Sequence, residues 1–284
     1  MTSPSTAPAA AGSLAGMAGP IVLVGAGRMG GALLQGWLGL GLDPTAVAVL
    51  EPQPSPEIAA LGRRGVRLNV PADALGTAAA VVLAVKPQTA PEVLPQIGAL
   101  VGASTTVVSI MAGRTLAFLE QKLPAQAAVV RAMPNTPAAV GRGITVAVAN
   151  ARLSAAQRDV AGRLLAATGA VEWIDDEQLM DAVTAVSGSG PAYVFLLAET
   201  LAHAGAAAGL PADLADRLAR ATVAGSGELL ARSTRAPDVL RREVTSPGGT
   251  TAAALDVLMA PGGMEALLDK AVAAATRRSR ELAG

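Results

Sequence analysis

Short apolar runs rich in valine, alanine and isoleucine alternate with helical stretches between Ile21 and about Trp173. The runs have the composition of strands buried on both faces, and they lie at 21–25, 47–51, 78–86, 105–110, 127–133 and 144–149. Helical patterns occur between them at 29–40 and 54–64, and after the last of them at 154–168. Strands joined through helices form right-handed crossover connections in a largely parallel sheet. The alternation therefore predicts an α/β domain with a doubly wound sheet over residues 20–174.

The pattern changes after Trp173, where helical stretches follow one another at 175–186, 191–208, 211–231 and 262–282 with no strand-like run. Residues 175–284 are therefore predicted to form an all-helical domain. The stretch 191–208 is apolar on most faces, which is typical of a buried helix. Because a small helical domain leaves little room to bury such a helix within one chain, we predict that it packs against a second copy, in a homodimer at least.

The composition excludes several classes of function. The 22 basic and 22 acidic side chains cancel, so no overall positive field attracts nucleic acid or an anionic membrane, and we expect neither partner. The chain has no cysteine and one histidine, His203, which lies in the apolar helical stretch and is expected to pack there. Thiolate nucleophiles and cysteine-rich zinc sites are excluded, and we predict no metal site.

Neither a secretory signal nor a membrane span is expected. The first 19 residues lack the basic segment and continuous apolar run of a signal peptide, and we predict a flexible tail over residues 1–19. The longest later uncharged stretch, between Glu92 and Arg114, is interrupted by Pro95 and several glycines, unlike a membrane-spanning helix of about 20 apolar residues. We therefore expect a cytoplasmic protein.

A glycine-rich hexapeptide, GAGRMG, follows the first predicted strand directly and begins the first predicted helix. Its members are Gly25, Ala26, Gly27, Arg28, Met29 and Gly30. In this position the glycines permit a tight turn, close approach of a diphosphate to the backbone, and close packing of the helix on the strand. The N–H groups and positive end of the helix favour the diphosphate. The motif predicts a dinucleotide site.

Residues near this motif leave the choice between NADH and NADPH open. Glu51 ends the second predicted strand, where a carboxylate accepts hydrogen bonds from the adenosine ribose and disfavours a 2′-phosphate. Arg28, Arg63 and Arg64 could instead clamp that phosphate, with Glu51 turned toward solvent. The sequence supports both arrangements.

Two further loops follow predicted strands at the same edge of the sheet. Val85, Lys86 and Pro87 come at the end of the third run, and Ala112 and Gly113 follow the fourth. Doubly wound folds bind ligands at the carboxyl ends of their strands. We therefore expect these residues to contact the cofactor, with Ala112 and Gly113 near its nicotinamide half.

Two loops in the second half of the chain combine glycine with hydroxyl residues, SGSGP at 187–191 and SPGGTT at 246–251. Such loops at helix starts expose N–H groups that suit small anions. Together with the dinucleotide motif and RAMPNTP at 131–137, they make the chain resemble the pyrroline-5-carboxylate reductase family. The resemblance runs from about Ile21 to Leu282, and it is most specific in DAVTAVSGSGPAYVF at 181–195 and VTSPGGTT at 244–251.

This resemblance implies a Rossmann domain, a helical domain for substrate binding and dimerisation, and reduction of 1-pyrroline-5-carboxylate to L-proline with NADPH or NADH, the last step of proline biosynthesis. It assigns the substrate carboxylate to Ser246 and the backbone of Gly248, Gly249 and Thr250, the ring nitrogen to Thr251, and a place near the substrate to Glu177. Glu51 and Glu243 depart from the family pattern, in which many members carry a hydroxyl residue at the first position and some an asparagine at the second.

Other dehydrogenase classes lack their catalytic acid here. A short-chain dehydrogenase needs Tyr-x-x-x-Lys, but the one tyrosine, Tyr193, is followed four residues later by Leu197. The β-hydroxyacid dehydrogenases carry a lysine in a similar GxGxxxK helix start, where this chain has Val194. Two alternatives remain: a reductase of another cyclic imine, and a protein that binds NAD(P) without turnover.

Overall fold

The computed structural model describes residues 12–283, which form two compact units. One unit contains residues 12–188 and 276–283, and the other contains residues 189–275. The division falls after Gly188 rather than after residue 174, the boundary expected from the sequence. The cause lies in the segment after the last strand, because Met180 is buried against Val146 and Val148 of the sheet.

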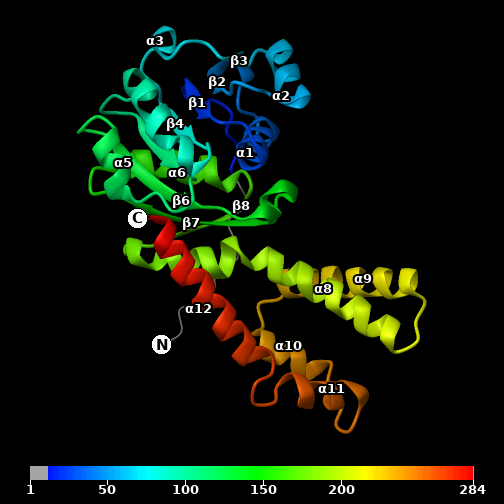
Figure 1. Cartoon of the computed structure of the whole chain (residues 1–284). Helices are drawn as coiled ribbons and strands as arrows, with labels where there is room; N and C mark the ends of the chain where they lie inside the picture. Colours follow the sequence, from blue (N-terminus) through cyan, green and yellow to red (C-terminus); the bar gives the residue numbers. More distant parts are fainter. Residues whose placement is uncertain (1–11, 284) are drawn as a thin grey trace. The chain divides into compact units, whose positions relative to one another are not determined.

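The first unit contains one eight-stranded sheet in the order β3-β2-β1-β4-β5-β6-β7-β8 (Figure 1). Neighbouring strands are parallel, except for the antiparallel pair β6–β7. The strands are β1 Ile21–Val24, β2 Val47–Leu50, β3 Arg67–Leu68, β4 Ala80–Leu83, β5 Thr106–Ser109, β6 Ala128–Met133, β7 Gly143–Ala149 and β8 Gly169–Trp173. The six predicted runs are all strands, whereas β3 and β8 were not expected.

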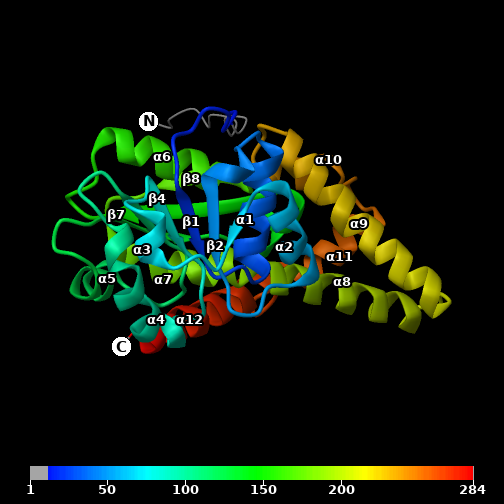
Figure 2. The same cartoon turned by 90° about the horizontal axis from the view of Figure 1, so that it is seen from above.

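Helices cover both faces of this sheet, as the alternating pattern predicts (Figure 2). Ile21 and Leu23 of β1 belong to a buried cluster with residues of α1, α2 and α6, while Val22 and Val24 belong to a second cluster with residues of α3, α4 and α5. The helices are α1 Arg28–Gly39, α2 Pro56–Leu61, α3 Ala72–Leu75, α4 Ala90–Val93, α5 Leu116–Lys122 and α6 Ala155–Ala166. Short 3₁₀ turns connect these elements at Pro44–Ala46, Gly62–Arg64, Pro87–Thr89, Leu94–Leu100 and Thr136–Val140.

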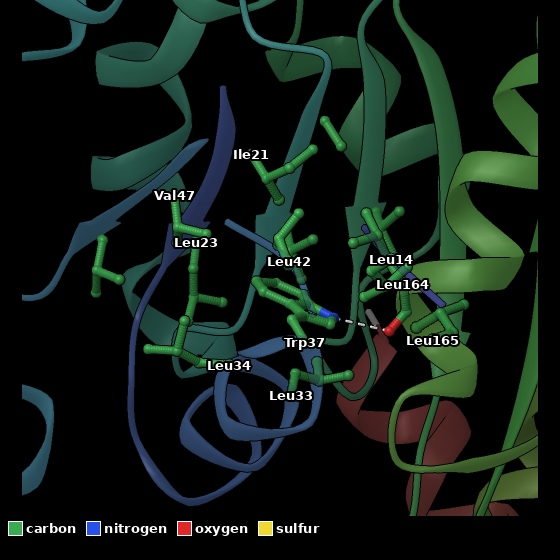
Figure 3. Close-up of a cluster of buried hydrophobic side chains, with 14 of the residues drawn as sticks. Leu14, Ile21, Leu23, Leu33, Leu34, Trp37, Leu42, Val47, Leu164 and Leu165 are labelled. Atoms are coloured by element: carbon green, nitrogen blue, oxygen red, sulfur yellow. Dashed lines mark hydrogen bonds between the residues drawn. The ribbon is translucent and has the colours of Figure 1, made fainter. Parts of the chain in front are cut away.

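Trp37 lies at the centre of the first cluster (Figure 3). It is fully buried, and its indole N–H donates to the Leu164 carbonyl at 2.8 Å. This bond satisfies the one polar atom of the side chain inside an aliphatic core. It also joins α1, the helix that begins within the glycine motif, to α6.

Part of the N-terminal segment is an ordered component of this core, in contrast to the flexible tail expected for residues 1–19. Leu14 is fully buried among the residues of Figure 3, and its N–H donates to the Leu40 carbonyl at 2.9 Å. Arg163 donates to the Ser13 carbonyl at 2.7 Å. The prediction is therefore wrong for Ser13 and Leu14, and residues 1–11 lie outside the described part of the chain.

The helix expected at 175–186 is divided into three short pieces. A 3₁₀ turn spans Glu177–Leu179, α7 spans Met180–Val183, and a π-helical turn spans Thr184–Gly188. Single π-helical turns within helices occur frequently at functional sites. Here the turn begins the SGSGP loop, and Gly188 leaves the room that the Met133 side chain occupies, since an added Cβ would lie 2.5 Å from Met133 Cε.

The second unit is helical, as predicted. Its elements are α8 Gly190–Ala207, α9 Ala212–Arg232, α10 Pro237–Glu243, α11 Thr250–Leu258 and α12 Met264–Ala283, whose last residues belong to the first unit. Helices α8 and α9 lie side by side (Figure 1). Although α8 is the apolar helix noted in the sequence, none of its residues is buried within the described chain, and Phe195 is 68% exposed.

Candidate functional site

The glycine motif forms the turn between β1 and α1. Gly25 has a φ of +89°, and a Cβ there would lie 2.7 Å from the Ala84 carbonyl oxygen. A Cβ at Gly30 would lie 2.3 Å from the Gly25 carbonyl oxygen. Both positions therefore require glycine, the first for a left-handed turn and the second for close helix packing.

Gly27 has a different role, because a Cβ at this position would meet nothing within 4 Å. Gly27 is the N-cap of α1 and supplies no capping side chain. The first N–H groups of a helix have no acceptor within that helix. The backbone is thus open to a ligand at this helix start, and these residues fit the diphosphate of a nicotinamide dinucleotide.

A cleft of about 700 Å³ lies beside this turn, at the carboxyl ends of β1, β2 and β4. The sheet order reverses between β1 and β4, which is where doubly wound folds bind ligands. Of the residues predicted to hold the cofactor, those that line the cleft are Gly25, Gly27, Glu51, Val85 and Lys86.

Glu51 faces the glycine motif. One carboxylate oxygen, Oε2, accepts the Ala26 N–H at 2.9 Å, and the other, Oε1, accepts the Gln53 N–H at 3.1 Å. The Asn69 side chain, which the sequence did not single out, holds the backbone of Glu51 through two hydrogen bonds. Asparagine tolerates the left-handed backbone that Asn69 adopts, with φ of +51°.

The three arginines considered as a phosphate clamp are placed differently. Arg28, Arg63 and Arg64 are exposed, and none of them lines the cleft. Met29, the remaining member of the motif, also lies outside its lining. Within the described residues, the charged side chains of the cleft are Glu51, Lys86 and Glu92.

The two loops after β4 and β5 are tied together by Arg114, another residue that the sequence did not indicate. Its guanidinium donates to the Pro87 carbonyl from Nε at 3.0 Å and from Nη2 at 2.8 Å. The same guanidinium lies 4.6 Å from the Phe118 ring centre, a favourable cation–π distance. Ala112 and Gly113 thus lie in a loop fixed to Pro87, at the sheet edge where the cofactor residues were expected.

Glu177 makes a structural ion pair. Its Oε1 accepts from Arg131 Nη1 at 2.7 Å and from the Leu116 N–H at 2.8 Å. Arg131 is 5% exposed, so its charge depends on this carboxylate. The sequence gave one signal for this pair, an arginine inside the apolar run of β6, because a charged residue in such a run is seldom buried without a partner.

The SPGGTT loop begins α11 in the second unit. The Gly249 N–H donates to the Ser246 carbonyl at 3.0 Å, and Gly248 has a φ of +69°. Gly249 is the N-cap of α11 and has no capping side chain, so Thr250 and Thr251 are the first two helical residues. The Thr251 hydroxyl is therefore not the cap of its own helix. The predicted substrate residues gather at this helix start, in a different unit from Glu177.

No group of three histidine, cysteine or acidic side chains suited to a metal ion occurs in the described part of the chain. None of the helices within residues 12–283 has the length and apolar composition that spanning a membrane requires.

Comparison with known proteins decides the family. Residues 177–282 match the family model for pyrroline-5-carboxylate reductase dimerisation, and residues 20–113 match that for NADP oxidoreductase, coenzyme F420-dependent. Pyrroline-5-carboxylate reductase of Pseudomonas aeruginosa is 41% identical over 264 residues, covering 93% of this chain and 96% of the relative. The chain belongs to the pyrroline-5-carboxylate reductase family. The Mycobacterium tuberculosis member is 40% identical over 288 residues, with 92% and 96% covered.

Solved structures of the family agree with this fold. The Coxiella burnetii reductase superposes with a TM-score of 0.87 at 32% identity, covering 94% of this chain and 99% of the other. The Plasmodium falciparum reductase, solved with NADP bound, gives a TM-score of 0.78 at 28% identity, with 93% and 98% covered. The Rossmann-type first domain and the helical second domain inferred from the sequence are both confirmed.

Proposed function

We propose that this chain reduces 1-pyrroline-5-carboxylate to L-proline with NADH or NADPH, the final step of proline biosynthesis. The observation that carries the proposal is the presence, on one chain of this family, of an open helix start at Gly27 and a second glycine-rich helix start at Gly249. The first suits a diphosphate and the second suits a small carboxylate. The two sites together match the two reactants.

Residues of the first unit hold the cofactor in this proposal. The backbone from Gly25 to Gly30 receives the diphosphate, and Glu51 receives the adenosine ribose. Val85, Lys86 and Pro87 contact the cofactor beyond the diphosphate, and Ala112 and Gly113 contact its nicotinamide half. The support for this arrangement is that Arg114 fixes both loops at the same edge of the sheet.

Residues of the second unit hold the substrate. The hydroxyl of Ser246 and the backbone of Gly248, Gly249 and Thr250 bind the carboxylate at the start of α11. The donors are the N–H groups of Gly248 and Thr250, because the Gly249 N–H donates to the Ser246 carbonyl and closes the loop. This helix has nine residues, and its N-terminus favours an anion. Thr251 hydrogen-bonds the ring nitrogen and orients it.

This chemistry needs no strong protein acid. The substrate imine can arrive already protonated, so its nitrogen carries the required proton before the reaction. A bound nicotinamide supplies the hydride, which adds to the imine carbon while the π electron pair becomes the nitrogen lone pair of the amine product. The chain contributes position, and correct placement of two reactants lowers a barrier by about 7 to 11 kcal/mol. The absence of cysteine and the single histidine are consistent with such a site.

The test is loss of nicotinamide absorbance when purified protein is mixed with 1-pyrroline-5-carboxylate and either NADH or NADPH. We expect oxidation of the cofactor that requires the imine. Oxidation only with a different cyclic imine would reassign the substrate. Cofactor binding with no oxidation by any imine would favour a protein that binds NAD(P) without turnover.

Two further parts of the proposal concern the setting of the enzyme. We propose a homodimer, formed through the helical residues that match the dimerisation model, and action in the cytoplasm. Cell fractionation of the native host tests the second point, since enrichment in the membrane or envelope fraction would contradict it.

A further inference from the structure

The residues that line the cleft beside the glycine motif bear on whether it binds NADH or NADPH. Glu51 is 2.9 Å from the Ala26 N–H through Oε2, so its carboxylate is directed to the motif that receives the diphosphate. The arrangement with Glu51 turned away toward solvent is therefore not the one observed. A carboxylate at the end of the second strand stands where the adenosine ribose of a dinucleotide lies.

The backbone of Glu51 is held by one side chain, that of Asn69, through two hydrogen bonds. Asn69 Oδ1 accepts the Glu51 N–H at 2.8 Å, and Asn69 Nδ2 donates to the Glu51 carbonyl at 2.9 Å. Asn69 is itself fixed, because its N–H donates to the Val49 carbonyl at 2.8 Å. The backbone at Glu51 is thus preorganised. Its carboxylate therefore cannot move far from a negatively charged ligand group, and the repulsion between them remains.

The hydrogen bonds of the Glu51 carboxylate leave capacity for a diol. An ionised carboxylate offers about four lone-pair positions, of which the Ala26 and Gln53 N–H groups use two. The 2′- and 3′-hydroxyls of an unmodified adenosine ribose supply two more donors. A 2′-phosphate removes one of those donors and brings a charge of about −2 at neutral pH.

Among the described residues, the charged side chains that line the cleft give no net positive charge to balance that phosphate. Its charged lining residues are two acids, Glu51 and Glu92, and one base, Lys86, a net charge of −1. Arg28, Arg63 and Arg64 lie outside its lining. NADPH would therefore place its 2′-phosphate beside a fixed carboxylate, with no arginine among the described residues that line the cleft.

We propose that Glu51 makes this chain prefer NADH to NADPH, and that Asn69 is the residue that positions it. The inference rests on the dinucleotide site of the proposed function, and it specifies the cofactor of that site. It separates this chain from the Plasmodium falciparum relative, which was solved with NADP bound.

The test measures binding rather than turnover. Isothermal titration calorimetry of the full chain with ADP-ribose and with 2′-phospho-ADP-ribose isolates the adenosine half, because neither ligand carries nicotinamide. We expect the unphosphorylated ligand to bind about tenfold more tightly or better, from the repulsion of a phosphate and a carboxylate about 4 Å apart at a wet surface. Titrations with NADH and NADPH should give the same order.

Three variants assign the effect. Glu51→Gln keeps the shape of the side chain and removes its charge, so the ratio of the two Kd values should fall toward one. Asn69→Gly retains the left-handed backbone but removes the two hydrogen bonds from the Asn69 amide to the Glu51 backbone. We expect its ratio of the two Kd values to lie between that of Glu51→Gln and that of the unmodified chain. Glu57→Gln is the matched control, because Glu57 is an exposed acid of α2 outside the cleft, and its ratio should equal that of the unmodified chain.

The experiments distinguish failure of the NADH preference from failure of the proposed imine reduction. Equal or tighter binding of the 2′-phosphorylated ligand by the unmodified chain would overturn the inference, as would a ratio that Glu51→Gln leaves unchanged. A protein that shows the expected ratio but reduces no imine would retain the inference and lose the proposed reaction. Imine reduction with a preference for NADPH would retain the proposed reaction and overturn the inference on cofactor preference.

Discussion

A single hydroxyl, that of Thr251, carries the most direct test of the substrate site. Gly249, not Thr251, is the N-cap of α11, so removal of the hydroxyl should leave the helix and the melting temperature unchanged. We expect Thr251→Ala to lower kcat by about ten- to a hundredfold, because a hydrogen bond to a charged partner contributes about 1.5–3 kcal/mol. Thr251→Ser is the control and should retain most activity. Unchanged steady-state kinetics in Thr251→Ala would remove this residue from the site.

The Glu177–Arg131 pair makes a second prediction, on stability. Arg131 is almost completely buried, and loss of its partner leaves an unpaired charge. Because Glu177 is itself 28% exposed, we expect Glu177→Ala to lower the free energy of unfolding by about 2–3 kcal/mol, less than the range for a fully buried pair. The measurement is urea denaturation followed by circular dichroism.

The control for this pair is Asp213→Ala, which removes an ion pair of similar length, 2.9 Å, between exposed Asp213 and Arg217. Such exposed pairs contribute about 0–1 kcal/mol. Equal losses in the two variants would contradict the importance of burial. If Glu177 also contacts the substrate, as the family resemblance implies, the KM should rise in Glu177→Ala and not in Asp213→Ala.

At the scale of elements, the loop before α11 offers a test that separates substrate from cofactor. A Cβ at Gly249 would lie 3.1 Å from the Ser246 carbonyl oxygen, so a bulky side chain displaces the N–H groups proposed to bind the carboxylate. We expect Gly249→Val to raise the substrate KM by about tenfold or more. The Kd of NADH, measured by titration, should stay within twofold, since the glycine motif lies in the other unit. A change in cofactor affinity with a normal KM would contradict the assignment.

Strand positions were predictable where both faces of a strand are covered. In β1 and β4 every residue is buried, so the sequence shows continuous apolar runs. The edge strand β8, GAVEW, has no buried residue and includes the exposed Glu172, and its pattern therefore resembles a loop. β3 has only two residues, too few to produce a pattern.

Site residues were predictable from the sequence where their roles depend on local sequence position, and not where their roles depend on contacts with distant residues. The glycine motif and Glu51 were found because their roles depend on position relative to a strand end. Asn69 and Arg131 escaped notice because their roles come from hydrogen bonds to residues 18 and 46 positions away. The cofactor choice likewise depended on where Glu51 and the three arginines lie in space.

At the scale of the whole first unit, the N-terminal segment is a part of the core. Leu14 is fully buried against the cluster around Trp37. We expect Leu14→Ala to lower the free energy of unfolding by about 2–5 kcal/mol, the range for removal of a buried leucine side chain. Leu179→Ala is a control, because Leu179 is 50% exposed and should cost less than about 1 kcal/mol. Equal stability of Leu14→Ala and the unmodified chain would contradict a role of Leu14 in stabilising this core.

The helical unit exposes many large apolar side chains on four of its helices. Large side chains that are at least 40% exposed occur on α8, α9, α11 and α12, and they include Val194, Phe195, Leu196, Leu229, Val257 and Leu267. Apolar surface of this extent marks an interface, and the unit matches a dimerisation model. We expect the chain to elute as a homodimer or a larger assembly in size-exclusion chromatography with light scattering.

A charge within that surface should dissociate the assembly. Phe195 is 68% exposed in the single chain, and Phe195→Glu would bury an unpaired carboxylate in the interface, which costs several kcal/mol. The expected product is a monomer whose isolated helical unit is less stable, so its melting temperature should fall and lose its dependence on protein concentration. The matched control is Val140→Glu, at a valine 76% exposed on the first unit, which should leave the mass of the assembly unchanged. Dissociation by Val140→Glu with an intact assembly in Phe195→Glu would place the interface on the nucleotide-binding unit instead.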